Sequence, residues 1–142
     1  MNIILKLLIA LYRRFIAPRS YAHPPFISGQ ALVFQPALAT ALGINEACIL
    51  QKMHEWIEYN RHVQKQDHFR EGRWWTYNTY EEWQRQHFTW LSVSSIKRIC
   101  LNLQRMGILI ATDSFSRGTD RTKWYTIDYQ KLSAAAAGGT KM

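Results

Sequence analysis

The side chains with the clearest chemical potential are cations, hydroxyls and an amide on a helix predicted from about Val93 to Met106. Apolar residues at helical spacing form its inner face, namely Ile96, Ile99, Cys100, Leu103 and Met106. The outer face carries Ser94, Ser95, Lys97, Arg98, Asn102 and Arg105. Arginine and lysine donate to guanine or phosphate, asparagine pairs with adenine, and a serine at a helix start can bind phosphate. The pattern favours a helix that contacts double-stranded DNA over an ordinary amphipathic helix.

The residues after this helix predict a hairpin with a cationic tip. From Gly107 on, the helical spacing of apolar residues gives way to alternation, which indicates strands over 108–112 and 123–129. The polar tip between them is built around Gly118 and offers Arg117, Arg121 and Lys123. Such a tip lies along the DNA backbone or in the minor groove, because phosphates attract cations there. The alternative is a solvated hairpin without a ligand.

Several elements before the basic helix would hold it in place. Aromatic and threonine residues predict a short strand over 73–77. Asn78 or Thr79 can cap a short helix that runs to about Gln86, and Ser92 can cap the basic helix after a tight connection. Strand, short helix, turn, longer helix and hairpin are the order of a winged helix-turn-helix. We therefore predict an α+β fold of this type, mostly helical with a small antiparallel β-hairpin wing.

The first half of the same domain is predicted to be helical. Pro36 and Gly43 frame a short helix over about 35–42, and Asn45 can cap a second helix that continues to about Tyr59. Polar residues over 61–72 predict a loop that ends in a turn.

The whole chain divides into three predicted parts. Residues 1–30 form an amphipathic helix and a proline-containing arm, and residues 31–132 form the winged-helix domain. Residues 133–142, with four alanines and two glycines, are predicted to be a flexible tail.

The charge of the chain is concentrated at its two ends. The formal net charge is +8. Residues 1–30 contribute +4, residues 31–91 contribute −1 from six bases and seven acids, and residues 92–142 contribute +5 from eight bases and three acids. A basic end surface suits a polyanion such as nucleic acid or an anionic membrane, although it can also serve only solubility.

The N-terminal helix is the part that DNA binding does not explain. Its apolar run over 3–11 is interrupted by Lys6 and is shorter than the roughly 20 residues that span a bilayer. Its polar stripe consists of Lys6, Ala10, Arg13, Arg14 and Ala17. Such a helix could lie on a membrane surface, on a partner protein or on its own domain, and we favour the last two.

No residue pattern indicates catalysis, so we predict a protein that is not an enzyme and needs no metal or cofactor. The sequence has no phosphate-cradling Gly-Lys-Ser/Thr loop, no His-Glu-x-x-His and no nucleophile elbow. Its histidines match no usual zinc spacing. Cys48 and Cys100 lie among apolar residues at helical spacing, which predicts buried thiols in a reducing compartment and hence a cytoplasmic protein.

Three uncommon segments carry a resemblance to a known family. The first comprises Gln35–Ala39, Gly43–Ala47, Leu50–Gln51, His54 and Trp56; the second is Trp75–Gln84; the third is Asp120–Tyr129 with Lys131 and Leu132. Over about 31–132 the chain resembles small winged-helix proteins in the replication modules of bacterial phages and plasmids. The resemblance implies a DNA-binding replication initiator or replisome organiser, with replication proteins as partners.

Two other functions remain open for the same fold. One is a transcriptional regulator of the mobile element, and the other is a protein–protein interaction module, since many winged helices do not bind DNA. The sequence also leaves open whether the protein is a homodimer.

Overall fold

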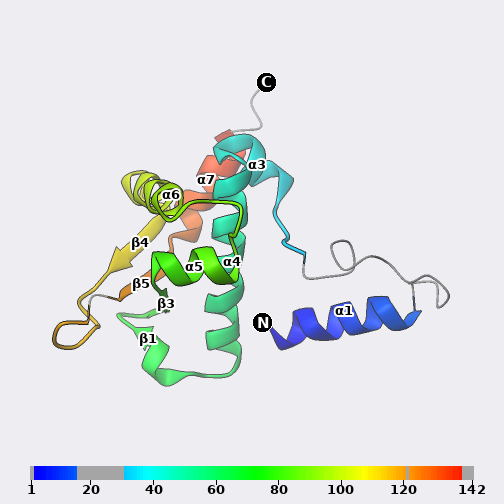
Figure 1. The fold of residues 1–142 in the computed structure, drawn as a ribbon, viewed down its shortest axis with the longest axis horizontal. Coiled ribbons are helices and arrows are strands. Elements are labelled where there is room, and N and C mark those ends of the chain that lie inside the picture. Colours follow the sequence, from blue (N-terminus) through cyan, green and yellow to red (C-terminus); the bar gives the residue numbers. More distant parts are fainter. Residues whose placement is uncertain (1, 16–30, 121, 139–142) are drawn as a thin grey trace.

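The computed structural model describes residues 2–15, 31–120 and 122–138. Its helices are α1 (Ile3–Phe15), α3 (Pro36–Leu42), α4 (Ile44–His62), the short 3-10 helix η1 (Gln66–His68), α5 (Tyr80–Gln86), α6 (Val93–Arg105) and α7 (Tyr129–Gly138). Its strands are β1 (Phe69–Arg70), β2 (Arg73–Trp74), β3 (Thr76–Asn78), β4 (Leu109–Thr112) and β5 (Lys123–Ile127). Helices combined with small antiparallel sheets make this an α+β structure, as predicted (Figure 1).

A three-stranded sheet joins the β4–β5 hairpin to the rest of the protein. Its order is β3–β5–β4, and both neighbouring pairs are antiparallel. Tyr125 on β5 lies opposite Thr76 on β3 and Ala111 on β4. Because β3 leads directly into α5, this pairing fixes the hairpin relative to the helices that follow β3. The strands β1 and β2 form a separate small hairpin.

The central strand β5 is buried on both faces. Tyr125 and Ile127 belong to the main core with α4 and α6. On the other face the ring centroid of Trp124 lies 4.7 Å from that of Tyr77, and the hydroxyl of Thr126 donates to the carbonyl oxygen of Trp74 at 2.8 Å. The small β1–β2 hairpin therefore helps to cover the face that the helices leave free.

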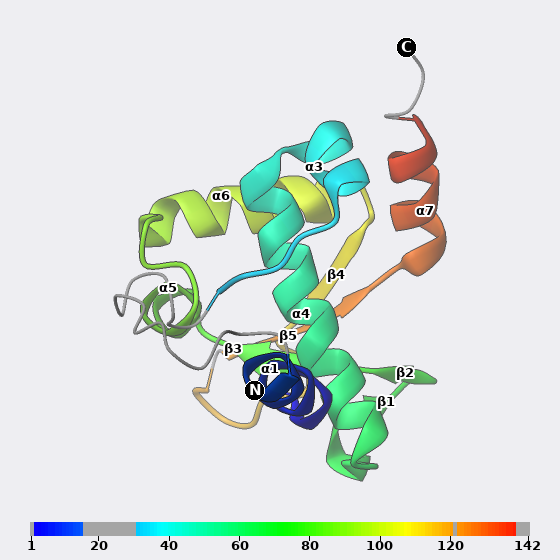
Figure 2. The same cartoon turned by 90° about the vertical axis from the view of Figure 1, so that its right-hand side faces the viewer.

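The main core forms around α4, which crosses the middle of the protein (Figures 1 and 2). Ile49, Met53 and Ile57 of α4 are buried in one cluster with the inner face of α6. Trp83 of α5 and Phe88 complete that cluster. Burial of one face of α6 leaves its opposite face to solvent.

The ends of α5 and α6 follow the predicted capping residues. Thr79 accepts a hydrogen bond from the backbone N–H of Glu82, whose side chain reaches back to Thr79, so the two form a capping box. The side chain of Ser92 accepts from the backbone N–H of Ser95 at 3.1 Å. Gly107 follows α6 with φ +73°, a conformation that favours glycine, and turns the chain into β4.

The start of α4 and the segment after it differ from the prediction. The cap position is Gly43, with α4 starting at Ile44, and the side chain of Asn45 instead accepts a hydrogen bond from Trp90 Nε1 at 3.0 Å. The predicted loop over 61–72 contains the end of α4, η1 and β1. The predicted strand over 73–77 is divided into β2 and β3. Strands β1 and β2 pair with each other across a tight turn, whereas β3 pairs with the distant strand β5, which local propensity does not reveal.

The predicted flexible tail from Ser133 is wrong for the residues up to 138, because they belong to α7. The backbone N–H of Lys131 donates to the Asp128 carboxylate at 3.1 Å in the first turn, and Leu132 and Ala135 pack against the core. Alanine is also the best helix former, so a packing surface suffices to order this segment. Residues 139–142 lie outside the described residues.

Helix α1 lies on the opposite side of α4 from α6 and the β4–β5 hairpin (Figures 1 and 2). Asn2, Leu5 and Leu8 face Gln51 and Glu55 of α4 across a cleft. The predicted arm, from residue 16 to residue 30, lies outside the described residues.

Candidate nucleic-acid interface

Helix α6 separates its apolar and basic residues onto two faces. Ile96, Ile99, Cys100 and Leu103 are at most 1% exposed. Ser94, Lys97, Arg98 and Arg105 are exposed on the other side. No acidic residue occurs in α6, so nothing within the helix neutralises its three cations. Met106 departs from the prediction of an inward side chain: it is the C-cap, and 50% of it is exposed.

Three of the predicted contact residues, Ser95, Asn102 and Arg105, form hydrogen bonds with α6 or its N-cap. Ser95 is half-buried, and its hydroxyl accepts a hydrogen bond from the Ser92 hydroxyl at 2.9 Å. Asn102 is also half-buried, and its side-chain oxygen accepts from Arg105 Nη1 at 2.9 Å. Ser95 therefore belongs to the helix cap, while Asn102 and Arg105 form a joined amide–guanidinium pair. Residue spacing alone had predicted only that Ser95, Asn102 and Arg105 share the outer face of the helix.

The loop between β4 and β5 carries the remaining predicted cations. Arg117 is exposed beside Gly118, whose φ of +62° suits glycine. Lys123 is half-buried as the first residue of β5 and lies opposite Asn78 of β3. Arg121 lies outside the described residues. The loop thus presents Arg117 outward, whereas Lys123 lies at the edge of the sheet.

Hydrogen bonds order this loop. The carboxylate of Asp120 accepts from the backbone N–H and the hydroxyl of Thr122, at 2.9 and 2.6 Å. These two bonds lower the pKa of Asp120, because they stabilise its charged form. The hydroxyl of Ser116 also donates across the loop to the carbonyl oxygen of Thr122 at 2.6 Å. Among the described loop residues, these hydrogen bonds join Ser116 and Asp120 to Thr122 on the far side of Arg117.

Ring contacts that the sequence did not predict hold the loop against Trp75, which lies between β2 and β3, and against Arg70 of β1. The ring of Phe115 lies edge-on to Trp75, with centroids 5.0 Å apart, and 5.8 Å from the ring of Trp124. The guanidinium of Arg70 stands 5.2 Å from the Phe115 centroid and 5.6 Å from that of Trp124. Arg70 is exposed, so it adds a cation near the loop. The sequence feature that could have indicated these contacts is Phe115 itself, a single apolar residue in a polar segment.

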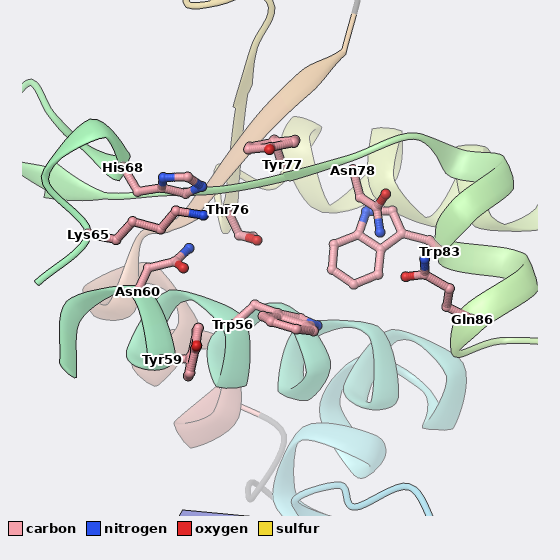
Figure 3. A pocket seen from close by; sticks show the side chains of 10 residues that line it. All are labelled: Trp56, Tyr59, Asn60, Lys65, His68, Thr76, Tyr77, Asn78, Trp83 and Gln86. Atoms are coloured by element: carbon pink, nitrogen blue, oxygen red, sulfur yellow. The ribbon is translucent and has the colours of Figure 1, made fainter. Parts of the chain in front are cut away.

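A separate cleft with a cavity volume of about 220 Å³ lies between α4, β3 and α5 (Figure 3). Aromatic and polar side chains line it together, namely Trp56, Tyr59, Asn60, Lys65, His68, Thr76, Tyr77, Asn78, Trp83 and Gln86. Asn60 is occupied with the carbonyl oxygen of Trp75, to which it donates at 2.9 Å. Burial lowers the pKa of His68. None of the ten lining residues is a carboxylate or a thiol, so the cleft has neither a thiol nucleophile nor a carboxylate metal ligand.

Both cysteines of the protein lie in its interior. Cys48 and Cys100 are both buried and free, as predicted for buried thiols, and burial raises the pKa of Cys100 to about 12. Among the described residues, no group of three or more histidine, cysteine, aspartate or glutamate side chains could hold a metal ion.

Comparison with protein-family models, with curated proteins and with solved structures gave no match. The resemblance to replication-module proteins therefore stays a prediction. Within the part of the chain that the structure describes, no helix has the length and apolar character needed to cross a membrane.

Proposed function

We propose that this chain is a winged-helix protein that binds double-stranded DNA sequence-specifically, with α6 in the major groove and the β4–β5 loop against the backbone. The observation that carries the proposal is the division of α6 into a fully buried apolar face and an exposed face with Lys97, Arg98 and Arg105. An α-helix about 10–12 Å wide fits a major groove about 12 Å wide. The buried face holds the helix rigidly while its cations remain available.

The order of elements supports the same proposal. From β3 onward the elements follow in the order β3, α5, α6, β4, β5, and the strands pair in the order β3–β5–β4. In a helix-turn-helix the second of two successive helices contacts base edges, and here that helix is α6. The hairpin that follows corresponds to the wing.

The exposed side chains suit different contacts. Arg98 and the Asn102–Arg105 pair present donors and an acceptor to base edges, where bidentate contacts discriminate between bases. Ser94 in the first turn of α6 and Lys97 suit phosphate oxygens. Arg117 in the loop suits the backbone or the minor groove.

Replication of a phage or plasmid is the proposed task, with replication proteins as partners. The support for this part is the resemblance of the three sequence segments alone. Footprinting on element DNA tests it: repeated sites at an origin support initiation, whereas a single palindrome at a promoter supports regulation.

The binding experiment begins with selection of bound sequences from a random duplex pool, followed by fluorescence anisotropy on the selected duplex. We expect Arg98→Ala with Arg105→Ala to weaken binding by about 30-fold or more, because each base contact contributes about 1–3 kcal/mol. Far-UV circular dichroism should be unchanged, since both side chains are exposed.

The matched control is Arg61→Ala with Lys65→Ala. It removes the same charge from exposed residues at the end of α4 that is distant from α6 (Figure 1). This control should retain most of the affinity. Equal affinity of both double variants, or enrichment of no sequence from the pool, would refute specific DNA reading by α6.

A further inference from the structure

Helix α1 carries a set of large apolar side chains that the rest of the described structure covers only in part. Ile3, Ile4, Leu7, Leu8 and Leu11 are 49–58% exposed. The other exposed large hydrophobics are distributed singly or in pairs over several different elements. A contiguous apolar surface of this kind is unfavourable in water and marks an interaction site.

The charge of the N-terminal segment indicates which kind of surface would cover α1. Residues 1–30 contain Lys6, Arg13, Arg14 and Arg19 and no acidic residue. At 3.6 residues per turn, Lys6 lies about 160° from Leu8 and about 140° from Leu11 but only about 60° from Ile3, so this cation borders the apolar side of the helix. Anionic lipid headgroups attract nearby lysine and arginine side chains, and the acyl chains accept the leucines.

The length of α1 restricts the geometry of such contact. Its 13 residues extend about 20 Å, less than the roughly 30 Å of a bilayer's hydrocarbon core. A short helix with a cationic side and a broad apolar side instead lies in the plane of the headgroups. Because α1 lies across α4 from α6 and the β4–β5 hairpin, its apolar side can be covered without covering α6 (Figure 1).

We propose that α1 binds the surface of an anionic lipid bilayer, with Leu7, Leu8 and Leu11 inserted between the headgroups and Lys6 directed towards the lipid phosphates. The proposal does not depend on DNA binding. Together with the DNA contact proposed for α6, it gives the protein two separate ligand surfaces, with lipid bound at α1.

Vesicle flotation with the full chain tests the proposal. The protein should float with vesicles of equal parts phosphatidylglycerol and phosphatidylcholine, and much less with phosphatidylcholine alone. Leu7→Gln with Leu8→Gln should reduce partitioning about 30-fold, because two half-exposed leucines lose their transfer to the apolar phase. The control Ile44→Gln with Val63→Gln also replaces two apolar side chains, at the two ends of α4, where they are 56% and 41% exposed. This control should float like the wild type.

Three outcomes would overturn the proposal. Absence of flotation with anionic vesicles excludes lipid binding. Unchanged flotation of the Leu7→Gln/Leu8→Gln variant assigns the attraction to another basic surface such as that of α6. A wild-type dimer in light scattering that becomes a monomer in this variant, without vesicle binding, assigns the apolar face to a second copy of the chain.

Discussion

Acid should destabilise the protein through His87, a half-buried residue whose ring lies near those of Trp56 and Trp83. Its ring centroid is 6.4 Å from that of Trp56 and 5.5 Å from that of Trp83, and neither ring nitrogen has a hydrogen-bond partner among the described residues. Burial lowers the pKa of His87 from 6.5 to about 4, and the positive charge of Lys52 acts in the same direction. The folded protein therefore keeps this imidazole neutral.

The direction of the pH effect follows from proton binding. The unfolded chain takes up a proton at His87 below pH 6.5, whereas the folded chain does so only below about pH 4. The stability that the neutral His87 contributes is thus fully present above pH 6.5. It is lost as the pH falls from 6.5 through 4, and below that pH it changes no further. From the two pKa values, the free energy of unfolding should fall by about 2 kcal/mol between about pH 7.5 and 5. This is an upper limit, because His87 is only partly enclosed.

Urea denaturation followed by far-UV circular dichroism across this pH range measures the effect. His87→Phe should abolish most of the fall of about 2 kcal/mol in the free energy of unfolding between these pH values, because phenylalanine binds no proton. This holds even if the substitution also changes the stability at the higher pH. His62→Gln, at an exposed position at the end of α4, is the control and should keep the wild-type slope. The burial of His68 acts in the same direction and sets the residual slope. An equal pH dependence in wild type and His87→Phe would refute the role of His87.

Four further predictions concern the interface, the caps and the core. Arg117→Ala should weaken binding to all duplexes similarly and reduce the salt slope of log K by about one, as measured by anisotropy at several salt concentrations; an unchanged slope would exclude a phosphate contact. Thr79→Ala should lower the free energy of unfolding by about 1 kcal/mol in urea, because it removes the capping box, and no loss would contradict that role. Phe115→Ala should increase amide hydrogen exchange over 113–120 through loss of its contacts with Trp75 and Trp124, and unchanged exchange would show that other contacts order the loop. The thiol of Cys100 should react with a disulfide reagent only in denaturant, since it is fully buried with a pKa of about 12, and rapid native reaction would contradict this.

Local patterns were sufficient to predict the elements nearest to the candidate interface. Thr79 and Ser92 cap the helices that the sequence placed after them, and the buried positions Ile96, Ile99 and Leu103 follow the helical spacing. These features depend on hydrogen bonds and side-chain periodicity within one or two turns, which a single segment of sequence encodes.

Contacts between distant segments were not predictable in the same way. One example is the contact of Phe115 with Trp75 and Arg70, which come from separate loops and strands. These three side chains meet because β3 pairs with β5. Asn45 likewise was predicted to cap α4, but its side chain accepts a hydrogen bond from the distant Trp90. Such pairs are determined by packing, which local propensity does not specify.

The sequence by itself determined that a basic amphipathic helix precedes a cation-tipped hairpin, because the charges and the apolar periods are local properties. Only the tertiary structure decided which cations are free. Lys123 is half-buried at the edge of the sheet, opposite Asn78 of β3, whereas Lys97, Arg98 and Arg117 remain exposed. The physical reason is that exposure depends on which elements pack against each face, and those neighbours come from other parts of the chain.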